Sequence, residues 1–527
     1  MANDLKNNDF LQFSLKLALI ASLMLAPLAV MLSCKWPMSN DFLFYGEMMD
    51  GFSRQFFQGD WYPRWLADSN AGYGSPAMIF YNPLSFFLSL PLAWLAPVDP
   101  HGLARVLAGM WLALLCAGLS CRYWLKAWLP ESQARTGALL YAGFPYLFTL
   151  AYFTYGIASL WAIACFPLVL TAIDRMRQSA WRGVPVLALA IALLVLAHAP
   201  SLMAFAAVPP AYAFAMANRG QRRRQLVLTG ISGLLAALLC SVYLLPMLLN
   251  RPFIRSEIYT QGRLGYAANF FFPNTLFGLC LIILPLLALY LEQRANPWNK
   301  PLVFWSAMLA FMLFMVSPFS RFIWDIITPL QYLQFPLRFY NPMLPGAVFI
   351  AASWLPTAKS RHVYACLFAT MLAYASLTGW QTWFADTKPV RPFLGIGATR
   401  EYQTRWMSDT RTDSPVPPDF GHAKITQGRG QLRVDRWTAR KITLHADIGK
   451  GGGRVTLHRF YFPGWSAGEP DGALLSVPLK EGAQEAELTF EPSGEVMGTR
   501  ISLAALCLLA GWQFISTDMR RGIPQTA

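Results

Sequence analysis

The sequence has little charge. Asp, Glu, Lys and Arg make up 13% of its 527 residues, whereas 55% are hydrophobic and 14% are aromatic. About a quarter of the residues in soluble domains are charged, so this composition excludes an ordinary soluble multidomain protein. Apolar segments of about 17 to 25 residues, the length that crosses a bilayer, recur along most of the chain. We therefore expect a mainly α-helical, polytopic transmembrane bundle.

Acidic residues are the scarcer charge. The chain holds 28 Asp and Glu against 43 Lys and Arg, a net charge of +15. In a soluble protein this excess would suggest a nucleic-acid partner, but in a membrane protein Lys and Arg collect in the cytoplasmic loops. Segment 381–499 is nearly neutral, with 15 basic and 14 acidic residues, so the excess belongs to the membrane part. We expect membrane lipids, and no nucleic acid, as partners.

Disulfide and metal-ligand spacings are also missing. Seven of the eight cysteines lie in apolar segments, where they act as small hydrophobic residues, and only Cys34 lies near a membrane edge. His422, His445 and His458 lack the spacing of metal ligands, and the first loop contains no Asp-x-Asp pair. We predict no metal site and no cofactor, and leave open whether the activity requires a divalent cation.

Hydropathy predicts about twelve spans. The first span follows acidic as well as basic residues, which favours a membrane helix over a signal peptide. The stretch 84–96 is apolar but too short to cross, and prolines inside the spans are tolerated in a bundle. The predicted spans are 13–33, 103–124, 136–153, 155–173, 184–199, 201–216, 226–248, 274–292, 301–316, 342–356, 363–380 and 500–516.

Basic residues set the orientation. They fall between spans on one side of the bundle, which the positive-inside rule identifies as cytoplasmic. Both termini are then cytoplasmic, and the outward segments are 34–102, 249–273, 317–341 and 381–499. The basic residues are Arg122, Lys126, Arg135, Arg175, Arg177, Arg182, Arg219, Arg222, Arg223, Arg224, Arg294, Lys300, Lys359, Arg361, Arg520 and Arg521.

Segment 381–499 is the one hydrophilic block of domain size. Residues 431–446 and 454–462 alternate in polarity as strands do, and three glycines at 451–453 predict a turn between them. We expect a β-sandwich-like domain over the outer face. The chain then divides into a bundle over 1–380 that includes the outer loop 34–102, this β-rich domain, and a last helix with a cytoplasmic tail over 500–527.

The first outer loop carries most of the polar and aromatic residues that chemistry would need. Loops longer than about 15 residues are usually functional or disordered, and its many aromatic residues argue against disorder. Aromatic side chains prefer the membrane interface, which places the carboxylates of the loop near lipid headgroups. Its notable runs are Ser39-Asn40-Asp41-Phe42, Gly59-Asp60-Trp61-Tyr62-Pro63-Arg64-Trp65, Gly72-Tyr73-Gly74-Ser75-Pro76 and Tyr81-Asn82-Pro83-Leu84.

With two later motifs, this loop resembles the YfhO-like membrane proteins of the GT-C glycosyltransferase superfamily. The later motifs are Gln334-Phe335-Pro336-Leu337-Arg338-Phe339 and Tyr461-Phe462-Pro463-Gly464-Trp465. Each motif is short, but their order and common outer placement support the resemblance. The chain departs from it at Ser159, where many relatives carry an acidic residue. The resemblance implies a GT-C-like fold in a bacterial cytoplasmic (inner) membrane.

The resemblance implies an enzyme that transfers a sugar, with inversion, from a polyprenyl-phosphate donor to a glycan, lipid or protein acceptor on the outer face. A base must take the proton of the acceptor hydroxyl, and Asp41 stands at the position that supplies it. Asp41 also suits a helix N-cap. Asp60 and Asp68 are weaker candidates, because either could instead pair with Arg64 or Arg54.

Arginine is suited to the leaving phosphate because its planar guanidinium binds phosphate in a bidentate manner. Arg338 is the first choice, and the alternative for the other outer arginines is contact with lipid headgroups. These are Arg64, Arg105, Arg255, Arg263 and Arg321. His198 lies near a span end, where it lines a site or only hydrogen-bonds a backbone carbonyl freed by Pro200. Tyr45, Tyr81 and Gln334 complete the predicted lining.

Two other functions remain open. A transporter or flippase of a lipid-linked glycan would also need a basic, aromatic cavity, but transporters commonly contain internal repeats, and the sequence shows none. A non-catalytic partner in envelope assembly would keep the fold and lose the base. Asp41 discriminates against that function.

Overall fold

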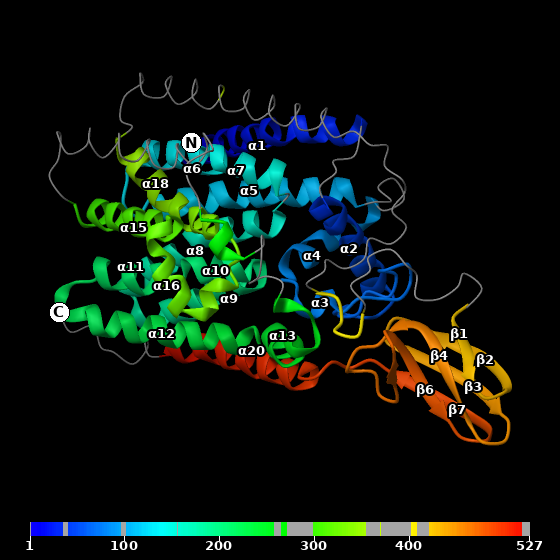
Figure 1. Ribbon diagram of the computed structural model, residues 1–527. Coiled ribbons are helices and arrows are strands. Elements are labelled where there is room, and N and C mark those ends of the chain that lie inside the picture. The colour runs from blue at the N-terminus through cyan, green and yellow to red at the C-terminus, as the bar shows by residue number, and fades with distance from the viewer. Residues whose placement is uncertain are drawn as a thin grey trace.

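In the computed structural model, a helical bundle carries a β domain at one end (Figure 1). The structure describes residues 2–34, 40–95, 102–154, 156–257, 265–270, 299–354, 369, 402–407 and 421–518. The predicted spans 274–292 and 363–380 lie outside these residues, apart from residue 369. The helical bundle and the C-terminal sheet domain are confirmed.

The long helices run along one another and bury a continuous apolar core. They are α1 (Ala2–Cys34), α5 (Leu103–Leu125), α6 (Glu131–Ala142), α8 (Ile157–Gln178), α9 (Ala180–Ala197), α10 (Ala199–Phe205), α11 (Val208–Met216), α12 (Arg222–Leu239), α13 (Ser241–Asn250), α15 (Lys300–Val316), α18 (Tyr340–Trp354) and α20 (Glu495–Asp518). Short elements join them: α7 (Pro145–Phe148), η2 (Thr149–Phe153), η3 (Arg219–Gln221), η4 (Arg251–Phe253), η7 (Tyr266–Ala268), η8 (Pro318–Ser320), α16 (Arg321–Ile326), α17 (Thr328–Gln331) and η9 (Pro336–Phe339).

Within the described residues, five helices are long and apolar enough to cross a membrane, or up to seven if two bent pairs each count as one span. The bends measure 72° between α12 and α13 and 82° between α15 and the η8–α16 pair. Predicted span 136–153 is divided among α6, α7 and η2, and 201–216 among α10 and α11. Among the described residues, helix length and composition therefore support five to seven of the roughly twelve predicted spans.

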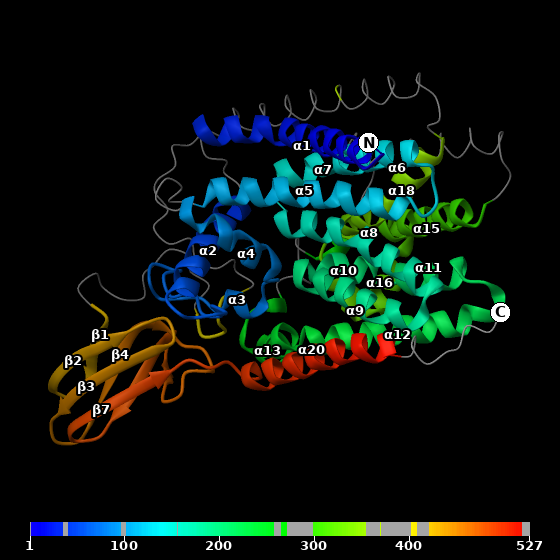
Figure 2. The same cartoon turned by 180° about the vertical axis from the view of Figure 1, so that it is seen from behind.

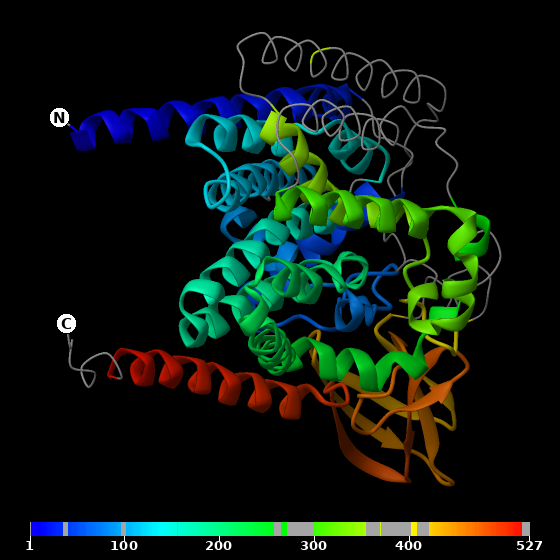
Figure 3. The same ribbon diagram turned by 90° about the vertical axis from the view of Figure 1, so that its left-hand side faces the viewer.

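The ends of the bundle differ. Helix α1 begins and α20 ends away from the β domain, which lies at the opposite end in both side views (Figures 1 and 3). Arg135 pairs with Asp9 near the start of α1 at 3.4 Å, and Trp512 of α20 donates to the Trp181 carbonyl at 2.8 Å. The basic turns around Arg135 and Arg182 thus lie with the two chain ends, as the predicted topology requires.

The first outer loop forms short elements beside the β domain (Figure 2). They are α2 (Asn40–Phe57), α3 (Ala77–Phe80), α4 (Leu84–Ser89) and η1 (Leu90–Leu95). The apolar stretch predicted not to cross, 84–96, is thus a short broken helix.

The β domain consists of two antiparallel sheets. One has the order β1-β4-β6-β5 and the other β2-β3-β7. Alternate residues of facing strands, such as Leu444, Leu457 and Val477, are buried between them. The strands are β1 (Ala423–Gln427), β2 (Gly430–Trp437), β3 (Lys441–Ile448), β4 (Gly453–Phe460), β5 (Glu469–Asp471), β6 (Leu474–Leu479) and β7 (Gly482–Thr489).

The strand pattern needs one correction. Residues 431–446, which alternate in polarity, belong to two strands, because Thr438 donates from its backbone to Lys441 and closes a turn between β2 and β3. The glycine turn is as predicted: Gly451 and Gly452 have φ angles of 94° and 75°, which glycine adopts without a steric penalty. β4 matches the predicted second strand.

Candidate functional site

The first loop is fastened to the β domain by aromatic packing. Trp65 is fully buried and lies 5.1 Å from Phe490 and 6.0 Å from Trp465, between ring centroids. Gly74 has a φ of 82°, and a Cβ atom there would stand 2.2 Å from the Trp65 ring nitrogen. The turn at 72–76 therefore needs glycine both for its backbone angle and for the close approach of the tryptophan.

Four charged residues form a cluster where the loop, the β domain and α20 meet; we call Asp60, Arg64, Arg440 and Glu495 the joint cluster. Glu495 binds Arg64 at 3.0 Å and both terminal nitrogens of Arg440 at 2.9 Å. Arg440 also pairs with Asp60 at 2.9 Å. Two cations and two carboxylates thus neutralise each other across segments far apart in the sequence.

The joint cluster is mostly buried, with Arg440 its most exposed member at 26% of its side chain. Arg64 has no exposed surface, donates to the Val242 carbonyl and stacks over the Tyr62 ring at 4.0 Å. Burial raises the pKa of Tyr62 to about 12, against the opposing charge of Arg64. Burial works to lower the pKa of Arg440, but the hydrogen bonds and charges of Glu495 and Asp60 outweigh it and raise that pKa. Asp60 and Arg64, predicted as catalytic and phosphate-binding, are thus paired within the protein.

A second set of ion pairs holds α2 against α5. Arg105 is fully buried and binds Asp50 at 2.9 Å and the Ser53 hydroxyl at 3.1 Å. Arg54 pairs with Asp50 at 3.0 Å and with Asp68 at 3.2 Å. The predicted pairing of Asp68 with Arg54 is confirmed. Arg105, predicted to bind phosphate, contacts a carboxylate of its own chain.

The other outer arginines that the structure describes, Arg255 and Arg321, contact different segments. Arg255 donates to the Met407 carbonyl and joins segment 402–407 to the end of η4. Arg321 is 63% exposed and lies 3.7 Å from Asp325. Arg263 lies outside the described residues. Arg255 and Arg321 thus each contact groups of their own chain.

A polar cluster lies inside the bundle where α9 ends and α10 begins; we call His198, Ser201, Asn341 and Tyr146 the break cluster. Tyr146 donates to the Asn341 side-chain oxygen at 2.8 Å, and Asn341 donates to the Ser201 hydroxyl at 2.9 Å. That hydroxyl lies 2.7 Å from His198 Nδ1, which also accepts from the Ser201 backbone at 3.3 Å. Nδ1 is therefore the acceptor, and the imidazole proton is on Nε2.

The first loop reaches this break through Asn82, which belongs to its Tyr-Asn-Pro motif. Asn82 is buried, donates to the Val195 carbonyl at 2.8 Å and accepts from the Ala199 backbone at 3.2 Å. It thus satisfies backbone groups that the extended conformation of His198 leaves outside both helices. Ser159, the position of the departure from the resemblance, lies 3.4 Å from His198 Nδ1.

The Gln-Phe-Pro-Leu-Arg-Phe motif also lies beside the break between α9 and α10. Its η9 turn packs against α10 and continues into α18, which carries Asn341. Arg338 donates to the Leu333 carbonyl at 2.7 Å and lies near enough for its charge to act on His198 and Tyr146. Gln334 is buried at the start of this turn with a φ of 65°, an uncommon angle for a residue with a side chain.

The predicted aromatic lining residues touch. The Tyr81 hydroxyl donates to the Tyr45 hydroxyl at 2.5 Å, and the two rings meet edge to face. Tyr45 is on α2, one helical turn beyond Asp41, which falls in the first turn of the same helix. The side chain of Asp41 lies outside the described part of the structure.

Sequence reasoning missed Glu495, Arg440, Asn341, Ser201 and Tyr146 as partners. Glu495 is the first residue of a long apolar helix, where a carboxylate is unusual, and this position could have marked it from the sequence. The others carry no local pattern, because their partners are distant in the chain. Among the described residues, no group of three His, Cys, Asp or Glu could hold a metal ion.

Comparison with protein-family models and with curated proteins finds no match to this chain.

Proposed function

We propose that the protein is an integral-membrane inverting glycosyltransferase that moves a sugar from a polyprenyl-phosphate donor to a glycan, lipid or protein acceptor. The observation that carries the proposal is the meeting of motifs at the break cluster. Asn82 of the first loop spans the break at His198, and η9 with Arg338 packs against the helix that follows it. Two of the motifs behind the resemblance thus converge on one buried polar site.

The third motif supports the same arrangement from the β domain. Phe462 and Trp465 pack against Trp65 of the first loop at ring distances of 6.3 and 6.0 Å. The loop is therefore held between the β domain and the break cluster. A rigid support of this kind is what a site needs to hold reacting groups in position.

In the proposed reaction, the oxygen of the acceptor hydroxyl forms a bond to the anomeric carbon while the bond from that carbon to the phosphate oxygen breaks. Asp41 takes the hydroxyl proton, and the phosphate leaves with the electron pair. Arg338 binds the departing phosphate, and His198 donates a hydrogen bond to that phosphate from Nε2. We assign Arg64, Arg105 and Asp60 to assembly, because each contacts an opposite charge within the fold.

The test uses membranes that contain the full chain and a panel of radiolabelled undecaprenyl-phosphate sugars. Asp41→Asn should lower donor consumption by about 100-fold or more, the usual contribution of a general base. Arg338→Ala should lower it by about 100-fold, as the loss of one transition-state donor does. Arg321→Ala, at an exposed arginine, is the matched control and should keep the wild-type rate. Wild-type turnover in Asp41→Asn would refute the catalytic assignment.

A transporter of a lipid-linked glycan is the second candidate, favoured by the two sharply bent helix pairs. Broken helices often line transport sites at mid-membrane. Proteoliposomes loaded with an undecaprenyl-linked sugar separate the two functions. Movement of the intact lipid between leaflets without release of undecaprenyl phosphate would identify a transporter, whereas sugar transfer would identify the enzyme.

We further propose that the β domain lies outside the bacterial cytoplasmic membrane and that both termini lie in the cytoplasm. The arrangement of the chain ends opposite the β domain supports this orientation. In intact cells, an impermeant maleimide should label Lys450→Cys, in the exposed turn after β3. It should label Gln221→Cys, in the basic turn before α12, only after lysis. The reverse pattern would overturn the orientation.

A further inference from the structure

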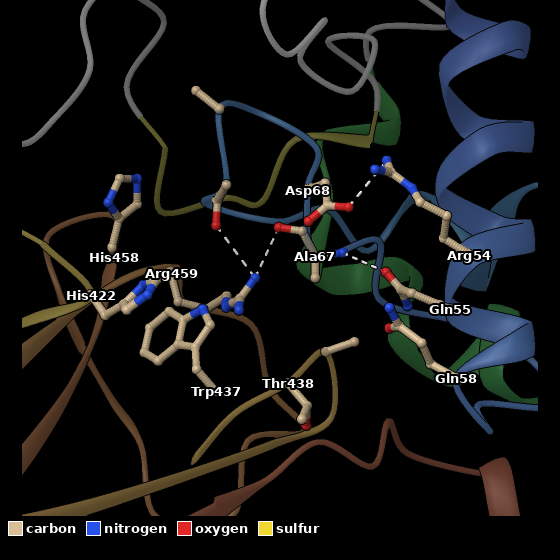
Figure 4. A pocket seen from close by; sticks show the side chains of 13 residues that line it. Arg54, Gln55, Gln58, Ala67, Asp68, His422, Trp437, Thr438, His458 and Arg459 are labelled. Carbon is tan, nitrogen blue, oxygen red and sulfur yellow. Dashed lines mark hydrogen bonds and ion pairs between the residues drawn. The ribbon is translucent and has the colours of Figure 1, made fainter. Parts of the chain in front are cut away.

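A cavity of about 420 Å³ lies between the first loop and the β domain, away from the break cluster. Figure 4 shows its two walls: the end of α2 and the loop around Asp68 on one side, and strands of the β domain on the other. Gln58 and Arg54 belong to the first wall, and Trp437 and Arg459 to the second. The proposed catalytic site uses none of these residues.

Arg459 is the unusual residue of the cavity. It is only 1% exposed, and its guanidinium donates to the backbone carbonyls of Ala67 and Gly72 at 2.9 and 3.3 Å. Its Nε has no hydrogen-bond partner among the described residues. A buried donor left in this way is costly unless a ligand or water satisfies it.

The charge of Arg459 is also left without a close carboxylate in the described part of the chain. Asp68 is the nearest acid to act on it, but Asp68 forms its ion pair with Arg54 instead. Burial lowers the pKa of Arg459 to about 10, and the charge of Asp68 only partly opposes this. A buried cation on the wall of a cavity favours an anion there.

The other groups of the cavity suit a hydroxyl-rich molecule. Trp437 is half-buried on the cavity wall, where its ring is contacted by Arg459 at 4.9 Å and by His422, stacked 4.7 Å away. Gln58 lies exposed at the end of α2, where its amide can both donate and accept. Rings that pack against apolar faces and amides that bond hydroxyls are the groups that recognise sugars.

We propose that this cavity binds an anionic saccharide, with Arg459 contacting its carboxylate or phosphate group and Gln58 its hydroxyls. The proposed site binds a ligand without catalysing a reaction. The proposal does not depend on whether the protein transfers sugars. The alternative of a lipid headgroup is disfavoured by position. One wall belongs to the β domain, which extends beyond the ends of the bundle helices (Figure 1), and acyl chains would have to remain among those helices.

Calorimetry and saturation-transfer NMR on the full chain in phosphatidylcholine nanodiscs test the proposal. The probes are glucuronate, glucose 6-phosphate, glucose and inorganic phosphate. Both anionic sugars should bind at least tenfold more tightly than glucose and than inorganic phosphate, and whichever binds better identifies the oxyanion. Equal binding of glucose, or equal binding of inorganic phosphate, would overturn the proposal.

Two variants locate the binding. Arg459→Gln should weaken the binding of the anionic sugars at least tenfold, but it also removes contacts to the loop backbone. Gln58→Glu is the second variant, because it adds a negative charge at the exposed end of α2 without removing a described contact, and it should weaken binding at least fivefold. Arg433→Gln, which changes an exposed arginine paired with Asp435 outside the cavity, is the control and should change nothing.

The same measurements exclude the competing ligand. If Gln58→Glu binds glucuronate as tightly as wild type, the cavity is not the site. If replacing phosphatidylcholine with phosphatidylglycerol in the nanodisc abolishes sugar binding in both the wild type and the Arg433→Gln control, a lipid headgroup occupies the cavity and the proposal fails.

Discussion

The joint cluster and the break cluster are both buried and polar, yet they are built differently. The joint cluster balances two cations against two carboxylates, all within ion-pair distance. The break cluster contains neutral groups joined in one chain from Tyr146 through Asn341 and Ser201 to His198. The joint cluster connects three segments that are far apart in the sequence. The break cluster fixes which ring nitrogen of His198 carries the proton.

The difference teaches what each kind of polar group does in this fold. Buried opposite charges hold segments together, because removing one charged partner leaves the other buried without a compensating charge. Neutral hydrogen bonds contribute less free energy but have a fixed direction, and here they set the tautomer of His198. The first loop takes part in both arrangements, because it contributes Asp60 and Arg64 to the joint cluster and reaches the break beside His198 through Asn82.

Removing the shared carboxylate of the joint cluster should have the largest effect. Glu495→Gln leaves Arg64 and Arg440 with reduced compensation in a buried site, which should cost about 3–5 kcal/mol of unfolding free energy. Thermal unfolding and limited proteolysis in detergent would report it. Glu469→Gln, at an exposed and longer ion pair, is the control and should cost about 0.5 kcal/mol or less. Equal unfolding of the two variants would show that the joint cluster does not fasten the loop.

Replacing Gly74 by alanine, against the Trp65 ring, should have the next largest effect on stability. Gly74→Ala combines an unfavourable φ with a clash against the Trp65 ring, costing about 1–2 kcal/mol for the backbone and about 1–3 kcal/mol for the clash. Gly72→Ala has a similar φ of 89° but open space around the new atom, so it carries the backbone cost alone. The difference in thermal unfolding between these variants measures the Trp65 contact, and no difference would contradict it.

Breaking the neutral chain should affect function more than stability. Asn341→Leu removes the bonds to Tyr146 and Ser201 and should cost about 1–3 kcal/mol of unfolding free energy. Because Ser201 then no longer holds His198 in one tautomer, donor consumption should fall at least about tenfold. Ser353→Ala, on the same helix with only a local bond to Ile350, is the control. If Asn341→Leu keeps the wild-type rate, the break cluster is structural.

The helices were predictable because length and apolarity act locally. Predicted spans such as 103–124, 155–173 and 184–199 fall on α5, α8 and α9 within a few residues. The bend between α12 and α13 was not predictable in this way, because hydropathy does not register a 72° change of direction at Cys240.

The site was predictable only as far as each residue's own chemistry. The sequence shows that Arg64 and Arg338 are outer cations, but it does not show that Arg64 meets Glu495 across 431 positions. Because of that contact, Arg64, which was predicted to bind phosphate, instead forms part of the ion-pair cluster that holds the first loop. His198 was predicted either to line a site or to hydrogen-bond a backbone carbonyl freed by Pro200, whereas in the structure its Nδ1 contacts the Ser201 hydroxyl and accepts from the Ser201 backbone N–H.

The smallest effect is expected at a partly exposed cluster, Glu131 with Arg122, Lys126 and Arg135. Burial alone would raise the pKa of Glu131, but hydrogen bonds from the three cations outweigh it and lower the pKa from 4.5 to about 2. A folded pKa below the unfolded one means that the stabilisation is complete above pH 4.5 and is lost as the pH falls toward 2.

Solvent screens this cluster, so Glu131→Gln should cost below about 1 kcal/mol at pH 7, far less than Glu495→Gln in the buried joint. The gap in melting temperature between Glu131→Gln and wild type should narrow steadily between pH 4.5 and 2. Glu491→Gln, at an exposed carboxylate with no described ion pair, should show no gap at either pH. A gap for Glu131→Gln as large as that for Glu495→Gln would mean that exposed and buried charge clusters fasten this fold equally, because burial would then add nothing to the strength of an ion pair.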